Sequence, residues 1–120
     1  MKVCTNENVR PFDIDGCLIV SADQSSLKAN VLDPVTGKTI KVGVNRAMVR
    51  LLKEEFQRGS FILVWSRSGY QWAKNVVIAL ELEQYVGQVM SKPIVYFDDT
   101  PVKKWLKDRV FIGPDVKYKE

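Results

Sequence analysis

The sequence predicts an α/β domain with a mainly parallel sheet. From residue 45 onward, apolar runs that suit strands alternate with segments that carry apolar residues at helical spacing. Two of these runs, at 61–65 and 94–97, are continuously apolar, as is typical of strands covered on both faces of a parallel sheet. Carboxylate and hydroxyl side chains follow them, at the edge where such sheets bind ligands.

The composition is that of an ordinary globular protein, with 46% hydrophobic and 27% charged residues among 120. This length suits one domain over residues 1–120. The net charge of +4 favours an anionic partner. No apolar run approaches the length of a membrane span, and the first residues lack the apolar stretch of a signal peptide. We therefore expect a cytoplasmic protein that makes no membrane contact.

The residue types present limit the available chemistry. The chain has no histidine, and its two cysteines, Cys4 and Cys17, do not have the spacing of metal ligands. Zinc sites and catalysis by Ser–His or Cys–His pairs are therefore nearly excluded. Proton transfer has to use carboxylates, Lys, Tyr or Cys.

The first part of the chain predicts short strands and a hairpin. A strand ends at about Phe12–Ile14, and a second short apolar run covers 17–20. Residues 29–44 alternate in hydrophobicity on one side of a turn at Thr36-Gly37, which is typical of a hairpin. We expect it to form a small flap over approximately 18–44.

The second part predicts helices between the strands. The first helix runs from about Asn45, a favourable cap, to Arg58, which precedes a glycine. A second is expected from about Tyr70 to Tyr85, closed by Gly87. Thr100-Pro101 begins a short third helix that carries Val102, Trp105 and Leu106, and 110–112 reads as a last strand.

Side chains that suit a metal ion and a phosphate flank the ends of three predicted strands: Asp13, Asp15, Ser66, Arg67, Lys92, Asp98 and Asp99. Two carboxylates about 4 Å apart repel by about 4 kcal/mol at an effective dielectric constant near 20. Four carboxylates at one edge of a sheet therefore require a cation. Oxygen ligands without His or Cys indicate Mg²⁺.

These residues resemble the four motifs of the haloacid dehalogenase (HAD) superfamily. Phe12-Asp13-Ile14-Asp15-Gly16 resembles the first motif, and Ser66 after FILVW resembles the second. Lys92 in Ser-Lys-Pro resembles the third, and Asp98-Asp99 after IVYF resembles the fourth. The motifs appear in the family's order over residues 12–99. The resemblance implies a three-layer, Rossmann-like, HAD-like fold with a mainly parallel central sheet, a small β-hairpin flap and no large cap domain.

The resemblance also implies an enzyme, a magnesium-dependent phosphatase that hydrolyses phosphate monoesters. Asp13 would be the nucleophile that forms an aspartyl-phosphate, and Asp15 the general acid and base. The remaining roles are binding of phosphate by Ser66, Arg67 and Lys92, and binding of Mg²⁺ by Asp13, Asp15, Asp98 and Asp99. Asp99 aligns with a metal ligand of family members whose fourth motif precedes Pro, and Asp98 is a second ligand or holds a water.

Two positions depart from the family pattern. Cys17 stands where the first motif usually has Thr, which mostly supports the loop. Pro11 lies in the strand that the resemblance makes central, where proline is rare because it cannot donate to the sheet. We therefore expect this strand to be short, or to begin at Phe12.

The absence of a large cap suggests a macromolecular substrate, and the positive charge agrees with a nucleotide or a nucleic acid end. A second copy in a homo-oligomer could instead supply a lid for a small metabolite. Two other hypotheses stay open: a catalytically degenerate member of the fold that binds phosphate or a partner, and a small basic nucleic-acid-binding protein. The last would need a contiguous basic and aromatic face, which the scattered lysines do not suggest.

Overall fold

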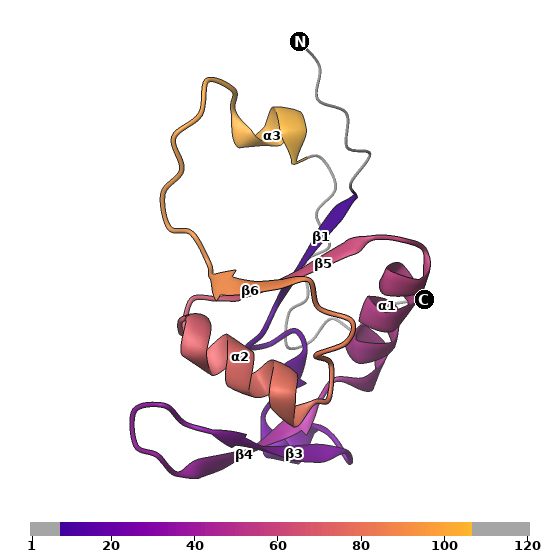
Figure 1. Cartoon of the computed structure of the whole chain (residues 1–120). Coiled ribbons are helices and arrows are strands. Elements are labelled where there is room, and N and C mark those ends of the chain that lie inside the picture. Colours follow the sequence, from indigo (N-terminus) through magenta and orange to yellow (C-terminus); the bar gives the residue numbers. More distant parts are fainter. Residues whose placement is uncertain (1–7, 107–120) are drawn as a thin grey trace.

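A computed structural model describes residues 8–106 and shows a small α/β domain with a three-stranded parallel sheet (Figure 1). The strands are β1 (Val9–Asp13), β5 (Phe61–Ser66) and β6 (Gln88–Ser91), in the order β1-β5-β6. Both pairs are parallel, so the carboxyl ends of all three strands lie at one edge of the sheet. The predicted α/β class and parallel sheet are confirmed.

A second, antiparallel sheet contains β2 (Ile19–Val20), β3 (Lys28–Leu32) and β4 (Thr39–Val44), in the order β2-β4-β3. The single-turn η1 (Ala22–Gln24) joins β2 to β3. The β3–β4 pair is the hairpin that the alternating pattern predicts. Asp33 closes its turn by accepting hydrogen bonds from the Val35 amide and the Thr36 hydroxyl, and the Val35 bond is the main cause of a lowered Asp33 pKa.

Three helices complete the described part of the chain: α1 (Arg46–Gln57), α2 (Tyr70–Ala79) and α3 (Val102–Trp105). The Asn45 side chain accepts a hydrogen bond from the Met48 amide, which confirms the predicted cap of α1. Helix α1 packs against β5, whereas α2 packs against β5 and β6 on one side and β3 on the other. Within residues 8–106, none of these helices has the length and apolar character that crossing a bilayer requires.

Helix α2 is shorter than predicted. It ends at Ala79 because Glu81 adopts a φ of 58°, in the left-handed region. The Glu81 amide donates to the Ile78 carbonyl, and the Leu82 amide donates to the Val77 carbonyl. This is the Schellman arrangement, with glutamate at the position that usually holds glycine. The turn directs Leu82 into the core, where it is fully buried. The prediction that the helix extends to Tyr85 is wrong, because no glycine marks the true end at Ala79 in the sequence.

Gly87 is not the end of α2, as the sequence suggested, but the residue before β6. Its amide donates to the Ile62 carbonyl, and its backbone lies against the Phe61 ring. A β-carbon at position 87 would overlap that ring. The glycine is therefore explained by close contact, not by a helix end.

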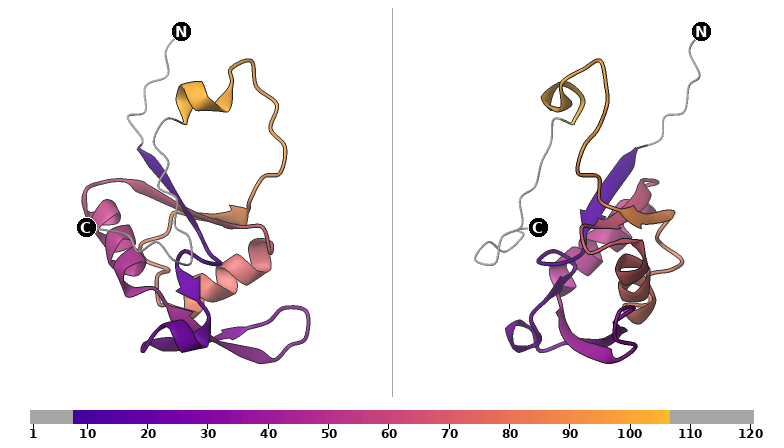
Figure 2. Two further views of the ribbon diagram at one scale, coloured as in Figure 1. Left: turned by 180° about the vertical axis from the view of Figure 1, so that it is seen from behind. Right: turned by 90° about the vertical axis from the view of Figure 1, so that its left-hand side faces the viewer.

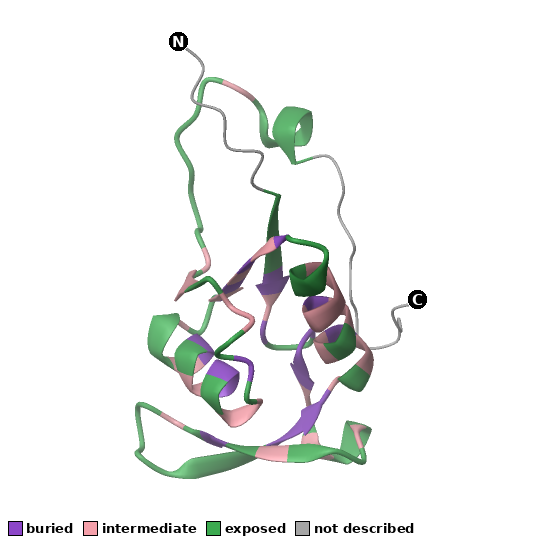
Figure 3. Cartoon of the chain, turned by 45° about the vertical axis from the view of Figure 1, so that its right-hand side comes forward, coloured by how far each residue is buried: buried purple, intermediate pink, exposed green. Residues whose placement is uncertain are grey.

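The core lies between the parallel sheet, the inner sides of α1 and α2, and the β3–β4 hairpin (Figure 3). Its largest fully buried side chains come from every layer: Ile14, Leu18, Val31, Leu52, Ile62, Val64, Val76 and Leu82. Burial of this apolar surface is the main force that fixes the strand ends in place.

Residues 92–106 project from this body as an arm that carries α3 (Figures 1 and 2). The predicted strand at 94–97 is not formed, and Ile94 and Phe97 are 89% and 97% exposed. A further parallel strand would have to start at the opposite end of the sheet, which requires a crossover of a dozen or more residues. Only Lys92 and Pro93 separate β6 from Ile94. The strand predicted at 110–112 lies outside the described residues.

Strand β1 is an edge strand among the described residues, and it begins at Val9 instead of Phe12. The Asn8 carbonyl accepts a hydrogen bond from the Phe61 amide. Because successive residues of a strand direct their backbone groups to opposite sides, the nitrogen of Pro11 faces away from β5. The proline therefore removes no hydrogen bond from the ladder between β1 and β5, which explains how the strand accommodates it.

Candidate active site

The turn after β1 presents two carboxylates to the same side. Asp13 ends the strand, Ile14 is fully buried, and Asp15 follows it. This alternation is the period of an extended chain, in which side chains two residues apart share a face. Gly16 then reverses the chain with a φ of 78°, and its amide donates to the Ile19 carbonyl. The buried isoleucine therefore holds both carboxylates toward solvent.

These carboxylates line an open hollow of about 530 Å³ at the carboxyl edge of the parallel sheet. Its lining comes from three segments: Asp13, Asp15, Arg67, Ser68 and Lys92. Arg67 and Ser68 follow β5, and Lys92 follows β6. The structure thus brings together residues from the ends of all three strands, at the edge where α/β sheets bind ligands.

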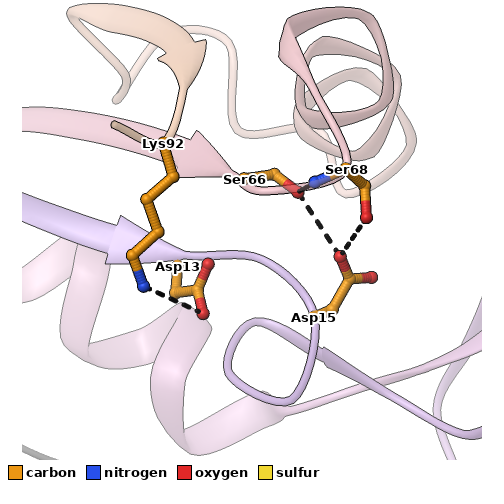
Figure 4. Close-up of polar contacts among 5 residues, drawn as sticks. All are labelled: Asp13, Asp15, Ser66, Ser68 and Lys92. Carbon is orange, nitrogen blue, oxygen red and sulfur yellow. Dashed lines mark hydrogen bonds and ion pairs between the residues drawn. The ribbon is translucent and has the colours of Figure 1, made fainter. Parts of the chain in front are cut away.

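Lys92 reaches across the end of β5 to Asp13 (Figure 4). Its ammonium nitrogen lies 3.8 Å from Oδ2 of Asp13, and both side chains are partly exposed, at 35% and 40%. The Lys92 amide donates to the Ser66 carbonyl, which fixes the start of the side chain. Partly exposed ion pairs add little to stability, so this pair is better suited to balancing charge in the hollow. The sequence predicts Lys92 just before the third strand, whereas in the structure Lys92 follows β6, the third strand of this sheet.

Asp15 is held by donors from the end of β5, from the β5–α2 connection and from α2 itself. Ser66 Oγ and Ser68 Oγ lie 3.4 Å and 3.2 Å from Oδ2 of Asp15 (Figure 4). The indole Nε1 of Trp72 donates to Oδ1 at 3.2 Å. Ser66 is fully buried, and its Oγ also accepts a hydrogen bond from the Ser68 amide. In this geometry Ser66 supports Asp15 and the loop, and it does not line the hollow.

Sequence reasoning missed the contacts of Ser68 and Trp72 with Asp15. Trp72 falls on the apolar stripe of its helix, which predicts a core residue. Its ring does pack against the core, but its single polar atom points to Asp15. Nothing in the spacing marks this contact, because the two residues meet only through the fold.

Cys17, which replaces the usual Thr of the motif, is buried beside Asp13. Burial, and then the negative charge of Asp13, raise the pKa of this thiol to about 11. The thiol is therefore protonated at neutral pH, and a protonated buried thiol is a poor nucleophile. Among the groups at this edge of the sheet, the nucleophile is better sought among the carboxylates.

The structure does not bring Asp98 and Asp99 to the hollow. Both residues belong to the projecting arm, residues 92–106; their side chains are exposed and do not line the hollow. Their hydrogen bonds are local: Asp98 accepts from the Thr100 amide, and Asp99 from the Thr100 hydroxyl. A hydrogen bond with Asp98 and the one from Thr100 lower the pKa of Asp99. These aspartates were expected at the site because residues 94–97 were expected to form the adjacent strand.

The donors at the hollow fit a magnesium ion only together with a substrate. Among residues 8–106, no group of three or more His, Cys, Asp or Glu side chains is placed to hold a metal ion. Mg²⁺ in phosphoryl-transfer sites is nevertheless commonly held by one or two carboxylates, several waters and the substrate phosphate. The carboxylate of Asp13, together with the backbone carbonyl of Asp15, would satisfy the protein part of that requirement.

Comparisons of the chain with protein-family models, with curated proteins and with solved structures give no match.

Proposed function

We propose that this chain is a magnesium-dependent phosphatase that cleaves phosphate monoesters through an aspartyl-phosphate on Asp13. The observation that carries the proposal is that Asp13 and Asp15 open onto one hollow together with Lys92 and Arg67. Two carboxylates supply a nucleophile and a proton carrier, and two cations balance the charge of a phosphate. The resemblance to the HAD motifs supports the same assignment, and with it a HAD-like, Rossmann-like, three-layer fold.

The chemistry proceeds in two displacements. A carboxylate oxygen of Asp13 attacks phosphorus, the P–O bond to the alcohol breaks, and Asp15 gives its proton to the departing oxygen. Water then attacks the phosphorus of the aspartyl-phosphate and gives a proton to Asp15. The P–O bond to Asp13 breaks, which releases phosphate and restores the Asp13 carboxylate. Bound at Asp13 and Asp15, Mg²⁺ would supply neutralisation of the charge on the phosphoryl oxygens.

Lys92 and Arg67 make the hollow able to accept a dianion. Without a cation, the carboxylate of Asp13 would repel the phosphate that it has to attack. The ammonium of Lys92, 3.8 Å from Asp13, offsets that repulsion. The wide opening of the hollow agrees with a nucleotide or a nucleic acid end as the phosphate carrier, as does the net charge of +4.

Hydrolysis of p-nitrophenyl phosphate by wild type, Asp13→Asn and Asp23→Asn tests the proposal. Asp23 lies exposed in η1, outside the hollow, so its variant controls for the loss of one carboxylate. We expect the Asp13 variant to lose at least about a thousandfold in kcat, as other enzymes do when the nucleophile is removed. The Asp23 variant should keep wild-type activity. Turnover that survives in Asp13→Asn would refute the assignment.

The requirement for metal is tested by titrating Mg²⁺ after treatment with EDTA, in wild type and Asp99→Asn. With Asp99 on the arm, wild type and Asp99→Asn should need the same Mg²⁺ concentration for half-maximal rate. A much higher requirement in Asp99→Asn would place the arm's acidic pair in the hollow during turnover, as the sequence predicts. A rate that is indifferent to EDTA would remove the metal from the proposal.

A second candidate function is phosphate binding without turnover. It is favoured by the placement of Asp98 and Asp99 outside the hollow, which leaves two carboxylates where the family motifs imply four. Calorimetric titration with inorganic phosphate, with and without Mg²⁺, distinguishes the two. Binding that needs Lys92 but is accompanied by no hydrolysis of any phosphate ester would select this alternative. Salt-sensitive DNA binding that ignores Mg²⁺ and Asp13→Asn would select the nucleic-acid-binding hypothesis.

A further inference from the structure

Hydrogen-bond donors from different elements contact both oxygens of the Asp15 carboxylate. Oδ2 faces the hydroxyl of Ser66, the last residue of β5, and the hydroxyl of Ser68 in the β5–α2 connection. Oδ1 accepts the indole hydrogen of Trp72, in the first turn of α2. The terminal torsion of an aspartate is broad and roughly two-fold, so a carboxylate held at one oxygen only can still rotate. Donors at both oxygens fix its plane.

Helix α2 is fixed by its packing against the core, and it therefore fixes the position of Trp72. The residues that follow Trp72 on the inner side of the helix, Ala73, Val76 and Val77, are almost completely buried. The Trp72 ring is partly buried against the same core, so its position follows that of the helix. The indole N–H is the only hydrogen-bonding group of the side chain, and it can only donate. A tryptophan needed for packing alone would not require this group to meet a carboxylate.

We propose that Trp72 is a positioning residue that sets the orientation of Asp15 from helix α2. The catalytic part of this inference rests on the proposed function, in which Asp15 gives a proton to the departing oxygen. Such a transfer needs the two heavy atoms about 2.6–3.2 Å apart and well aligned. A carboxylate free to rotate satisfies that geometry only part of the time. Trp72 touches neither substrate nor metal in this scheme and acts only through Asp15.

Substrates that differ in their leaving group separate positioning from a general structural role. p-Nitrophenolate leaves without being protonated, whereas an alkoxide leaves only with a proton from the acid. In Trp72→Phe, which keeps an aromatic ring but lacks the N–H, we expect kcat/KM on an alkyl phosphate such as glycerol phosphate to fall roughly tenfold to a hundredfold, because kcat/KM reports the steps up to release of the alcohol. The kcat/KM on p-nitrophenyl phosphate should change by less than about twofold. The second displacement, in which Asp15 takes a proton from water, is common to both substrates and enters kcat only.

Trp105→Phe is the matched control, because it makes the same substitution in α3, on the arm and away from the hollow. Trp105→Phe should leave the activity on both substrates unchanged. An equal loss of kcat/KM on both substrates in Trp72→Phe would mean that the tryptophan only maintains the fold. No loss on either substrate would mean that the hydrogen bond has no role in turnover. Either result overturns the proposal.

A spectroscopic measurement tests the contact even if the chain hydrolyses no phosphate ester. The three tryptophans give three indole N–H signals in a ¹H–¹⁵N correlation spectrum, and Trp72→Phe identifies the signal of Trp72. In Asp15→Ala this signal should move upfield, because its acceptor is gone, while those of Trp65 and Trp105 stay in place. A Trp72 signal that does not respond to Asp15→Ala would refute the inference. Absence of turnover with an intact response would refute the phosphatase proposal alone.

Discussion

The ammonium of Lys92 lies 3.8 Å from the carboxylate of Asp13, although Lys92 follows β6 and Asp13 ends β1, the two outer strands of the described parallel sheet. The lysine side chain spans the end of β5 to make this contact (Figure 4). An exposed ammonium alone would indicate little, since most surface lysines are simply solvated. The contact of Lys92 with Asp13, which we propose as the nucleophile, is the reason that we propose a role for Lys92 in balancing charge.

Replacing Lys92 by Met should weaken phosphate binding without unfolding the protein. A charge-assisted contact contributes about 1.5–3 kcal/mol, so we expect KM, or the Kd for inorganic phosphate, to rise roughly tenfold to a hundredfold. Lys103→Met in α3 is the control and should change neither. Thermal unfolding of both variants should stay close to wild type, because the Lys92–Asp13 pair is partly exposed. Unchanged phosphate affinity in Lys92→Met would contradict the role.

The buried thiol of Cys17 should make stability fall at high pH. Its pKa is about 11 in the folded chain against 9.0 for an ordinary thiol. Below pH 9 the thiol is protonated in both states, and the favourable effect is complete. Between pH 9 and 11 only the unfolded chain releases the proton, so stability declines as the pH rises, by roughly 2–3 kcal/mol in total.

Cys17→Ala lacks this titration and provides the reference. The difference in unfolding free energy between wild type and Cys17→Ala should shrink between pH 9 and pH 11 in denaturant titrations. A difference that is constant from pH 8 to pH 11 would show that the thiol does not have a raised pKa. In Asp13→Asn the decline should still begin near pH 9 but should end at lower pH and be smaller, because the charge of Asp13 contributes to the raised pKa of the folded chain.

Glu81→Gly should stabilise the protein. Glu81 is the one residue other than glycine with a positive φ in residues 8–106, at 58°. The left-handed conformation costs a side-chain-bearing residue about 1–2 kcal/mol, and the extra freedom of glycine in the unfolded chain returns part of that. We expect a net gain of roughly 0.5–1 kcal/mol in denaturant unfolding. Glu83→Gly, two residues on, should lose stability. A loss in both variants would contradict the Schellman end of α2.

Gly87→Ala should destabilise the protein because the added methyl group meets the ring of Phe61. Overpacking of this kind costs about 1–3 kcal/mol, and the lower end is expected because the Phe61 ring is only partly buried. The double variant Gly87→Ala/Phe61→Leu removes the overlap. It should be less destabilised than the sum of its two single variants in thermal or denaturant unfolding. Additive losses would argue against a close contact between the two positions.

The sequence predicts those features that depend on local pattern. The strand at 61–65 and the helix that starts at Asn45 follow from an apolar run and from a cap, and both are present. Lys92 is an exception, because it follows β6, a strand that the sequence did not predict. Asp13 and Asp15 reach the edge as predicted, because they adjoin the carboxyl end of a parallel strand. Such features need no knowledge of which strands are neighbours.

The features that were missed depend on tertiary geometry. Residues 94–97 are more apolar than β6, yet β6 forms the strand, because the length of the connection decides whether a segment can pair. Because that segment does not pair with the sheet, Asp98 and Asp99, which follow it, do not lie at the site. The early end of α2 depends on a left-handed glutamate, which residue statistics disfavour. The contact of Trp72 with Asp15 joins residues far apart in the chain, so no local pattern contains it.

The proline of β1 has a consequence for how copies of this protein meet one another. An edge strand with free amide groups invites pairing with a strand of another molecule, the first step toward fibres. At Pro11 the outward-facing position has no hydrogen to donate, so the run of donors along this edge is interrupted at its middle residue. Within residues 8–106, where β1 is an edge strand, Pro11 therefore disfavours pairing of this side of the sheet with a strand of another molecule, while it leaves every hydrogen bond to β5 in place.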